Sequence, residues 1–206
     1  MYLPLLAILV IVFVLLLREK DPARRSVILR RAGFAAMALG TLFIGAFLVA
    51  ETFHDPGGWE AVGLVALWVI PLGALGSLAW FRPDWAVWVF AVLIAGAIGV
   101  GVWFAADPDW WRAFEDRNGP VRDIGLFALS AAIALLGLKR TRAAGILLLV
   151  LGIVPAAVAT IAGSEGNVVL YVISSAPVVA GAMYVWSAAD AGRAGGLDLT
   201  GARAVP

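Results

Sequence analysis

Cysteine is absent from this chain of 206 residues, and charged residues are scarce. Without cysteine the protein has no disulfide, no thiolate metal site and no thiol redox chemistry. Only 14% of the residues are charged and 63% are hydrophobic, which is far from the balance of a soluble domain. A formal net charge of +1 provides no electrostatic basis for binding nucleic acid. Composition therefore predicts an integral membrane protein.

Histidine is nearly absent as well, because His54 is the only one in the chain. A single imidazole excludes a multi-histidine metal site, and the last apolar stretch contains no lysine for a retinal Schiff base. The centres of the apolar stretches contain no Asp, Glu, Lys, Arg or His. Proton relays and ion paths need ionisable groups at membrane depth, so proton-coupled transport is disfavoured.

What the chain does contain is seven apolar stretches, at residues 1–17, 32–50, 59–81, 85–106, 124–138, 143–162 and 168–187. A helix needs about 20 residues to cross a hydrocarbon core of roughly 30 Å. Continuously apolar segments without alternation favour helices over barrel strands. We therefore predict an all-α bundle of seven transmembrane helices over residues 1–187, followed by a flexible cytoplasmic tail at 188–206.

Cations are concentrated on one side of this predicted topology. Twelve lie after the first, third and fifth stretches and in the tail: Arg18, Lys20, Arg24, Arg25, Arg30, Arg31, Arg82, Lys139, Arg140, Arg142, Arg193 and Arg203. The other side has three, Arg112, Arg117 and Arg122, among several acids. Lysine and arginine near span ends stay on the cytoplasmic side. The N-terminus is then outside and the C-terminus inside, and we expect a bacterial cytoplasmic membrane.

Aromatic residues lie where the two membrane boundaries should be, because tryptophan and tyrosine prefer the headgroup region. The residues expected at the inner boundary are Trp80, Phe81, Trp85, Tyr184 and Trp186. Those expected at the outer boundary are Trp59, Trp103, Phe104, Trp110 and Trp111. In the longest outer loop Asp107 can cap a short interfacial helix that begins at Pro108. We favour an anchored loop there over a lid.

The connections also suggest three repeated helical hairpins after the first helix, at residues 31–81, 82–140 and 141–186. Short similar segments support the repeat: Gly-Leu-Val-Ala-Leu begins at Gly63 and Gly-Leu-Phe-Ala-Leu begins at Gly125. Asp55-Pro56 and Asp107-Pro108 open two of the outer loops. Parallel hairpins would differ from the inverted repeats of many carriers.

One group of residues has the chemistry of a metal or acid-base site. Glu51, His54 and Asp55 would share one face if the second helix runs through them. Two carboxylates and an imidazole can bind a divalent metal such as zinc, or transfer protons. The competing interpretation is a turn at Asp55-Pro56, with the other two side chains solvated at the interface. No other cofactor is predicted.

Small residues and prolines within the apolar stretches indicate where helices pack closely and where a cavity could open. Close helix contact is expected at four pairs with four-residue spacing: Ala36 with Gly40, Gly73 with Ser77, Ala95 with Gly99, and Ala176 with Ala180. Pro71, Pro155 and Pro177 lie deep within stretches and can open a cavity.

These features predict a non-enzymatic accessory, scaffold or lipid-associated subunit. Its partners would be membrane lipids and a second membrane subunit or a second copy of the chain, with no nucleic acid. The alternatives are a permease or channel-like protein for an uncharged or lipidic molecule, and a metal-dependent membrane enzyme that uses Glu51, His54 and Asp55.

Overall fold

The computed structural model describes residues 19–54, 58–107, 110, 121–161 and 168–201, and within these ranges every regular element is an α-helix. The helices are α2 (Pro22–His54), α3 (Gly58–Phe81), α4 (Pro83–Ala106), α6 (Val121–Gly137), α7 (Thr141–Ile161) and α8 (Val168–Gly201). The predicted all-α class is thereby confirmed for the described residues. The apolar stretch at 1–17 lies outside them.

Helix α2 begins well before the apolar stretch that was predicted at residues 32–50. Pro22 occupies its first turn, and the Asp21 carboxylate accepts a hydrogen bond from the Ala23 amide at 2.9 Å. This is a standard helix start, with an aspartate cap before a proline. The prediction of a loop that contains Arg24 to Arg31 was therefore wrong. Hydropathy marks the apolar part of a helix, whereas the hydrogen-bonded backbone of α2 extends over its polar first turns as well.

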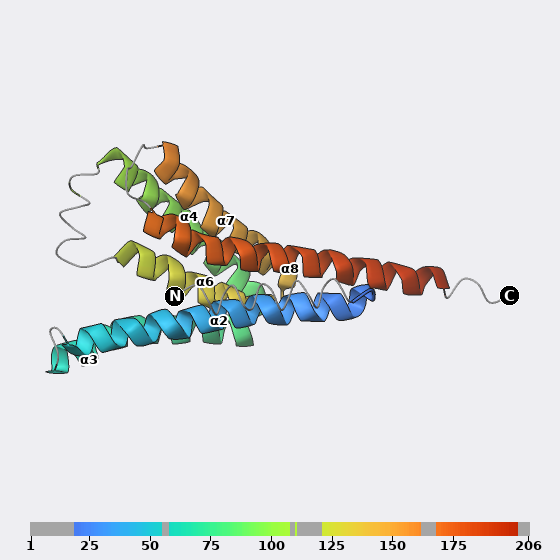
Figure 1. Cartoon of the computed structure of the whole chain (residues 1–206), viewed down its shortest axis with the longest axis horizontal. Helices are drawn as coiled ribbons and strands as arrows, with labels where there is room; N and C mark the ends of the chain where they lie inside the picture. Colours follow the sequence, from blue (N-terminus) through green and yellow to red (C-terminus); the bar gives the residue numbers. More distant parts are fainter. Residues whose placement is uncertain (1–18, 55–57, 108–109, 111–120, 162–167, 202–206) are drawn as a thin grey trace.

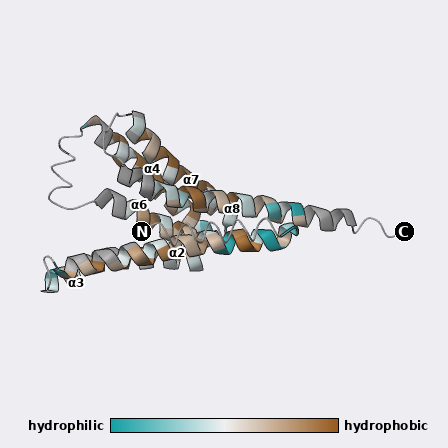
Figure 2. Ribbon diagram, viewed as in Figure 1, coloured by the Kyte–Doolittle hydropathy of each residue, from teal (hydrophilic) through white to brown (hydrophobic). Residues whose placement is uncertain are grey.

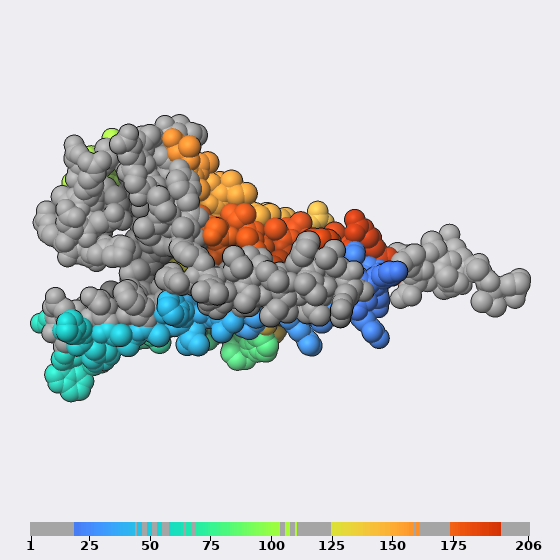
Figure 3. All heavy atoms as spheres, in the orientation of Figure 1, coloured from blue at the N-terminus to red at the C-terminus, as the bar shows by residue number. Residues whose placement is uncertain are grey.

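Helix α8 also extends past its predicted apolar stretch, which ended at residue 187. It continues to Gly201, so residues 188–201 are helical where the sequence predicted a flexible tail. Asp190 in this extension is fully buried. The reason is tertiary: the first part of this extension lies beside the start of α2, where Asp190 is bound by Arg25 (Figures 1 and 3).

Three helices of the described part are long and apolar enough to cross a membrane, over Pro22–Phe43, Pro83–Trp103 and Thr141–Val158. Shorter apolar helical segments cover Val69–Phe81 and Gly125–Gly137. At about 1.5 Å per residue, the 24 residues of α4 extend to roughly 36 Å, which exceeds a hydrocarbon core. Three candidate spans suggest membrane integration, while the count of seven, the orientation and the hairpin repeat remain predictions.

The helices converge at one end of the bundle and separate toward the other (Figure 1). Helix α8 packs most extensively against α7 and α2, while α3 packs on α6 and α4 on α7. The largest fully buried apolar side chains gather in the converging half: Leu29, Met37, Phe90, Ile133, Leu136, Leu148, Leu151 and Tyr184. The core is thus concentrated toward that end.

The converging end is rich in cations, and we call it the cationic end. Three contacts between separate segments lie toward that end: Lys139 with the Trp80 carbonyl, Arg140 with Asp84, and Arg25 with Asp190. Hydrophilic residues gather along α2 and α8 toward this end, whereas the rest of the bundle is largely apolar (Figure 2). The arginines of separate segments therefore share one end of the fold.

Exposed aromatic side chains occur at both ends of the bundle. Trp80, Phe81, Trp85 and Trp186 are exposed at the cationic end, and Trp59, Trp103 and Trp110 at the opposite end. The side chains of Phe104 and Trp111 lie outside the described set.

Tyr184 is a correction to the predicted inner boundary, because it is fully buried instead of exposed. Its hydroxyl donates to the Ala134 carbonyl at 2.7 Å. The Leu138 amide donates to Leu135 at this helix end, so Tyr184 supplies the hydrogen bond that the carbonyl of Ala134 needs.

Helices α7 and α8 approach so closely that their contact requires glycine. A Cβ atom on Gly145 would lie 2.9 Å from the Val185 amide nitrogen, and one on Gly181 would lie 2.9 Å from the Gly145 carbonyl oxygen. A Cβ on Gly152 would lie 2.6 Å from a Val178 methyl carbon. Small residues at a membrane helix interface allow this backbone contact, which increases van der Waals attraction.

Candidate functional site

A buried ion pair joins α2 and α8 at the cationic end. Arg25 donates from Nε and Nη2 to the two carboxylate oxygens of Asp190, at 2.6 and 2.8 Å. Arg193, one turn further along α8, donates from Nη1 to the same carboxylate at 2.9 Å. The Asp190 side chain is 0% exposed and that of Arg25 is 24% exposed. With Ser26 and Ser187, these residues form what we call the α2–α8 polar cluster.

The two serines extend the cluster along both helices: Ser26 follows Arg25 on α2, and Ser187 lies one turn before Asp190 on α8. Ser187 donates from Oγ to the backbone carbonyl of Ser26 at 2.8 Å, and the two Oγ atoms are 3.1 Å apart. Ser187 and Asp190 share a face of α8 because they are three residues apart. The guanidinium of Arg25 also lies 5.9 Å from the ring centre of Trp186, within the range of a cation–π contact.

The electrostatics of the cluster keep Asp190 ionised. The hydrogen bond from Arg25 lowers the pKa of Asp190, against the opposing effect of burial, and the charges of Arg25 and Arg193 lower it further. Both carboxylate oxygens accept hydrogen bonds from guanidinium groups. A carboxylate held in this way is a poor proton acceptor. The cluster is therefore suited to fastening two helices, and not to acid-base chemistry.

Sequence reasoning missed this cluster, since it assigned Arg25 to a loop and Asp190 to a flexible tail. Two local signals were present. Asp21-Pro22 is a helix start of the kind recognised at Asp107-Pro108, and Asp190 and Arg193 have helical spacing. The pairing itself joins positions 165 residues apart and has no local signature.

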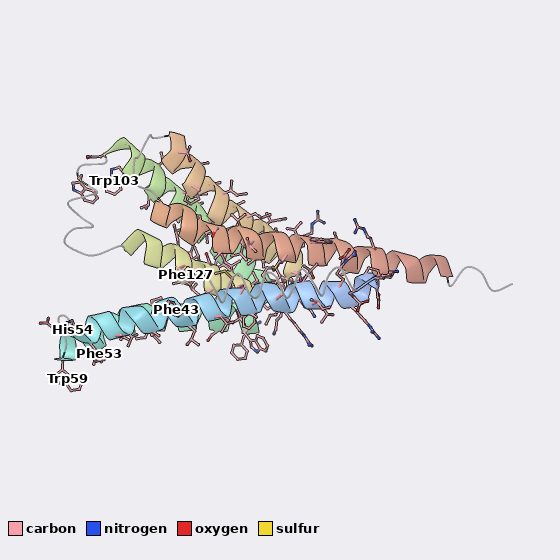
Figure 4. The ribbon with its side chains drawn as sticks, viewed as in Figure 1. Phe43, Phe53, His54, Trp59, Trp103 and Phe127 are labelled. Atoms are coloured by element: carbon pink, nitrogen blue, oxygen red, sulfur yellow. The ribbon has the colours of Figure 1, made fainter. Side chains whose placement is uncertain are left out.

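The predicted metal site is only partly covered by the structure. His54 ends α2 with an exposed side chain, close to Trp59 at the end of the bundle opposite the cationic end (Figure 4). Glu51 lies on α2, but its side chain and the whole of Asp55 lie outside the described residues. Among the residues that are described, no three His, Asp or Glu side chains form a group fit for a metal ion. The triad of Glu51, His54 and Asp55 stays a prediction.

An apolar groove of about 350 Å³ lies between α2, α3 and α6. It is lined by Phe34, Ala38, Thr41, Leu42, Leu72, Gly76, Ala131, Ala132 and Leu135. Thr41 supplies the only side-chain polar group of this set, and its hydroxyl donates to the Met37 carbonyl at 2.7 Å. A polar ligand would find little to bind here. We call this cavity the α2–α3–α6 groove.

The prolines do not line the groove. Pro71, Pro155 and Pro177 each lie inside a continuous helix. Pro71 is exposed, whereas Pro177 is buried. Near Pro177 the Ser174 hydroxyl is buried and has no hydrogen-bond partner within the described part of the chain. The prediction that these prolines open a cavity gains no support from their positions.

At the start of the connection between α4 and α6, the Asp107 carboxylate accepts a hydrogen bond from the Trp110 amide at 3.3 Å. This bond matches the predicted helix cap. The rings of Trp103 and Trp110 stack, with centres 4.9 Å apart, so α4 anchors this point of the loop. Residues 111–120, which include Trp111, lie outside the described ranges.

Comparisons with protein-family models, with curated proteins and with solved structures found no match to this chain. Its function must therefore be inferred from its own residues and fold.

Proposed function

We propose that the chain is a multi-pass protein of a bacterial cytoplasmic membrane, with seven helices, its N-terminus outside and its C-terminus inside. It serves as a non-enzymatic accessory, scaffold or lipid-associated subunit that binds a second membrane protein through α3 and α4. The observation that carries the proposal is that two of the four predicted small-residue pairs face out of the bundle.

The four pairs separate into two kinds. Ala36 and Ala180 are buried, and the Gly40 Cβ position would lie 3.0 Å from the Phe127 ring. These pairs are occupied by contacts within the chain. Gly73 and Gly99, by contrast, have no atom within 4 Å of their Cβ positions, and their pair members Ser77 and Ala95 are exposed.

The open pairs lie among exposed apolar side chains. Val69 and Ile70 of α3 are 57% and 68% exposed, and Val92 of α4 is 70% exposed. Lipid tails are as apolar as these side chains, so helices associate in a bilayer mainly by close packing at small residues. An outward small-residue face permits such packing with a helix of another protein.

Buried polar groups support a structural role. The side chains of Asp190, Ser187, Ser130 and Tyr184 are all hydrogen-bonded within the protein. Ser130 donates to the carbonyl one turn earlier in its own helix, at 2.7 Å, and the other three join separate helices. These polar atoms stabilise the bundle.

Native mass spectrometry of the protein gently extracted from its own membrane tests the proposal. We expect a stoichiometric second protein, which is lost in Gly73→Leu and Gly99→Leu and retained in the control Gly45→Leu. Gly45 is also open, but it lies on α2. A turnover that is abolished by changing outer-loop acids would contradict the proposal, as would a bare chain that no variant alters.

A second candidate is a permease or channel-like protein for an uncharged or lipidic molecule. The specific observation in its favour is the α2–α3–α6 groove, whose lining suits an apolar cargo. Flux of such a molecule into proteoliposomes, lost when Gly76 in the groove becomes leucine, would support transport. Liposomes that stay impermeable with the protein incorporated would exclude it.

A further inference from the structure

We propose that the α2–α3–α6 groove is a binding site for an anionic membrane phospholipid, with an acyl chain in the groove and the phosphate at the cationic end. The inference rests on the membrane integration of the proposed function and identifies the lipid class and its position. It requires three features: an apolar groove (the slot), cations at one end of that groove (its mouth), and an uninterrupted path between the two.

The slot is apolar and open along the side of the bundle, where Leu42 is exposed. Its walls are helix surfaces from the middle of α2, the second half of α3 and the second half of α6. Gly76 widens it, because a Cβ there would lie 3.6 Å from a Leu135 methyl carbon, in ordinary contact. The Thr41 hydroxyl hydrogen is already bonded within α2. A hydrocarbon chain meets no unsatisfied donor along this path.

The mouth of the groove follows from helix direction. Helix α2 begins at the cationic end and runs away from it. Arg30 and Arg31 therefore lie about one turn closer to that end than Phe34 does. Helices α3 and α6 run toward that end. Trp80 therefore follows the groove-lining Gly76 by one turn of α3. Lys139 follows the groove-lining Leu135 by four residues, just past the end of α6. A step of three or four residues within a helix stays on one face and covers about 5–6 Å. Lys139, past the end of α6, is placed beside Trp80 by its hydrogen bond to the Trp80 carbonyl.

One cation at the mouth is held in place. Lys139 donates from Nζ to the Trp80 carbonyl, and its ammonium lies 4.4 Å from the centre of the Trp80 ring. Neither partner carries a negative charge, so the full positive charge of Lys139 remains for another ligand. A tryptophan beside a lysine is also the pairing expected at the headgroup boundary.

The other two cations lack a counter-charge. Within the described residues, no acidic side chain forms an ion pair with Arg30 or Arg31. Arg31 is exposed and Arg30 is partly buried. Arg25 and Arg140, by comparison, are paired with Asp190 and Asp84.

Three positive charges at the end of an apolar slot complement a phosphate diester attached to acyl chains. Basic pockets between membrane helices on the cytoplasmic side bind such headgroups. The occupant is therefore an anionic glycerophospholipid, and not a free anion or a polar solute.

The test uses the full chain in nanodiscs with equal amounts of phosphatidylglycerol and phosphatidylcholine, released in native mass spectrometry. We expect one retained lipid per chain, with phosphatidylglycerol favoured roughly tenfold, because each cation near an anionic headgroup adds to binding. In Arg31→Gln with Lys139→Gln the lipid preference should fall toward equality. Arg142→Gln, which removes an exposed cation from α7 at the same end, should leave the preference unchanged.

A second pair of variants tests the slot. Gly76→Leu fills it and should abolish lipid retention, whereas Gly63→Leu on the same helix points into open space and should not. Equal retention of both lipids, or retention that Gly76→Leu leaves intact, would overturn the inference. A cross-link between Leu42 and residues 1–17 that persists in lipid would also overturn it, since the chain itself would then fill the groove. Either result leaves a co-purifying partner protein unaffected, so the proposed function is judged separately.

Discussion

Asp190 shows how one residue can fasten two helices. Replacing it with asparagine removes the negative charge that faces Arg25 inside the bundle. We expect Asp190→Asn to lower the free energy of unfolding by roughly 1–3 kcal/mol, the usual cost of leaving a buried polar group without its partner. Thermal unfolding in detergent, followed by circular dichroism, measures this loss.

The matched control is Asp84→Asn, which breaks the exposed pair with Arg140. Asp84 is 72% exposed, so its pair is screened by water, and we expect a change of about 0–1 kcal/mol. Equal effects of the two substitutions would show that the buried pair is no stronger than a surface pair.

The same residue predicts a dependence of stability on pH. The pKa of Asp190 is lowered in the folded protein, mainly by the hydrogen bond from Arg25, so the folded state binds its proton more weakly than the unfolded state does. The stabilisation is complete above the unfolded aspartate pKa of about 3.9 and is lost as the pH falls from there toward the lowered value. The difference in melting temperature between wild type and Asp190→Asn should shrink in that range. A constant difference down to strongly acid pH would contradict the assignment.

The residues of the polar cluster also show where sequence reasoning ends. The helical spacing of Asp190 and Arg193 can be recognised from the chain alone, because it depends on neighbours within one turn. The pairing of Asp190 with Arg25 cannot, since it depends on how α2 and α8 rotate and pack. Tyr184 was placed at a membrane boundary by its residue type, yet packing against α6 buries it.

Among the elements, α7 and α8 make a contact that is sensitive to side-chain size. A methyl group on Gly152 would lie 2.9 Å from the Ser174 carbonyl oxygen and closer still to Val178. We expect Gly152→Ala to destabilise the protein by about 1–3 kcal/mol, as overpacking does in tight cores. Urea unfolding in mixed micelles provides the measurement.

Gly192→Ala is the control for that substitution, because a Cβ on Gly192 of α8 meets no atom within 4 Å. Alanine is the better helix former by about 1 kcal/mol, so this variant should be neutral or slightly stabilising. If both variants unfold alike, the helices do not approach as closely as described.

Helices α2 and α8 are both longer than predicted, but the cause is local for α2 and tertiary for α8. The early start of α2 follows from Asp21 and Pro22, a signal within three residues. The continuation of α8 beyond residue 187 has no comparable signal, because the segment is rich in glycine. Asp190 in this continuation is bound by Arg25 of α2, so contact with another element accompanies the longer helix.

For the whole molecule, the testable property is orientation in the membrane. The chain has no cysteine, so single-cysteine variants report one site each. We expect a membrane-impermeant maleimide to label Glu60→Cys in intact cells, and Lys20→Cys and Arg142→Cys only after permeabilisation, because cations stay on the cytoplasmic side. All three positions are exposed. The reverse pattern would invert the proposed topology.

The sequence by itself determined the all-helical class of the described residues, the apolar character of the helices and the uneven distribution of cations along the chain. Each of these depends on composition or on a single run of residues, since helix hydrogen bonds and hydropathy are local. Only the tertiary structure decided that Gly40 faces inward and Gly73 outward, that Asp190 is buried against Arg25, and that Phe34, Gly76 and Leu135 share one groove. Such choices depend on the rotation and packing of helices that lie far apart in the chain.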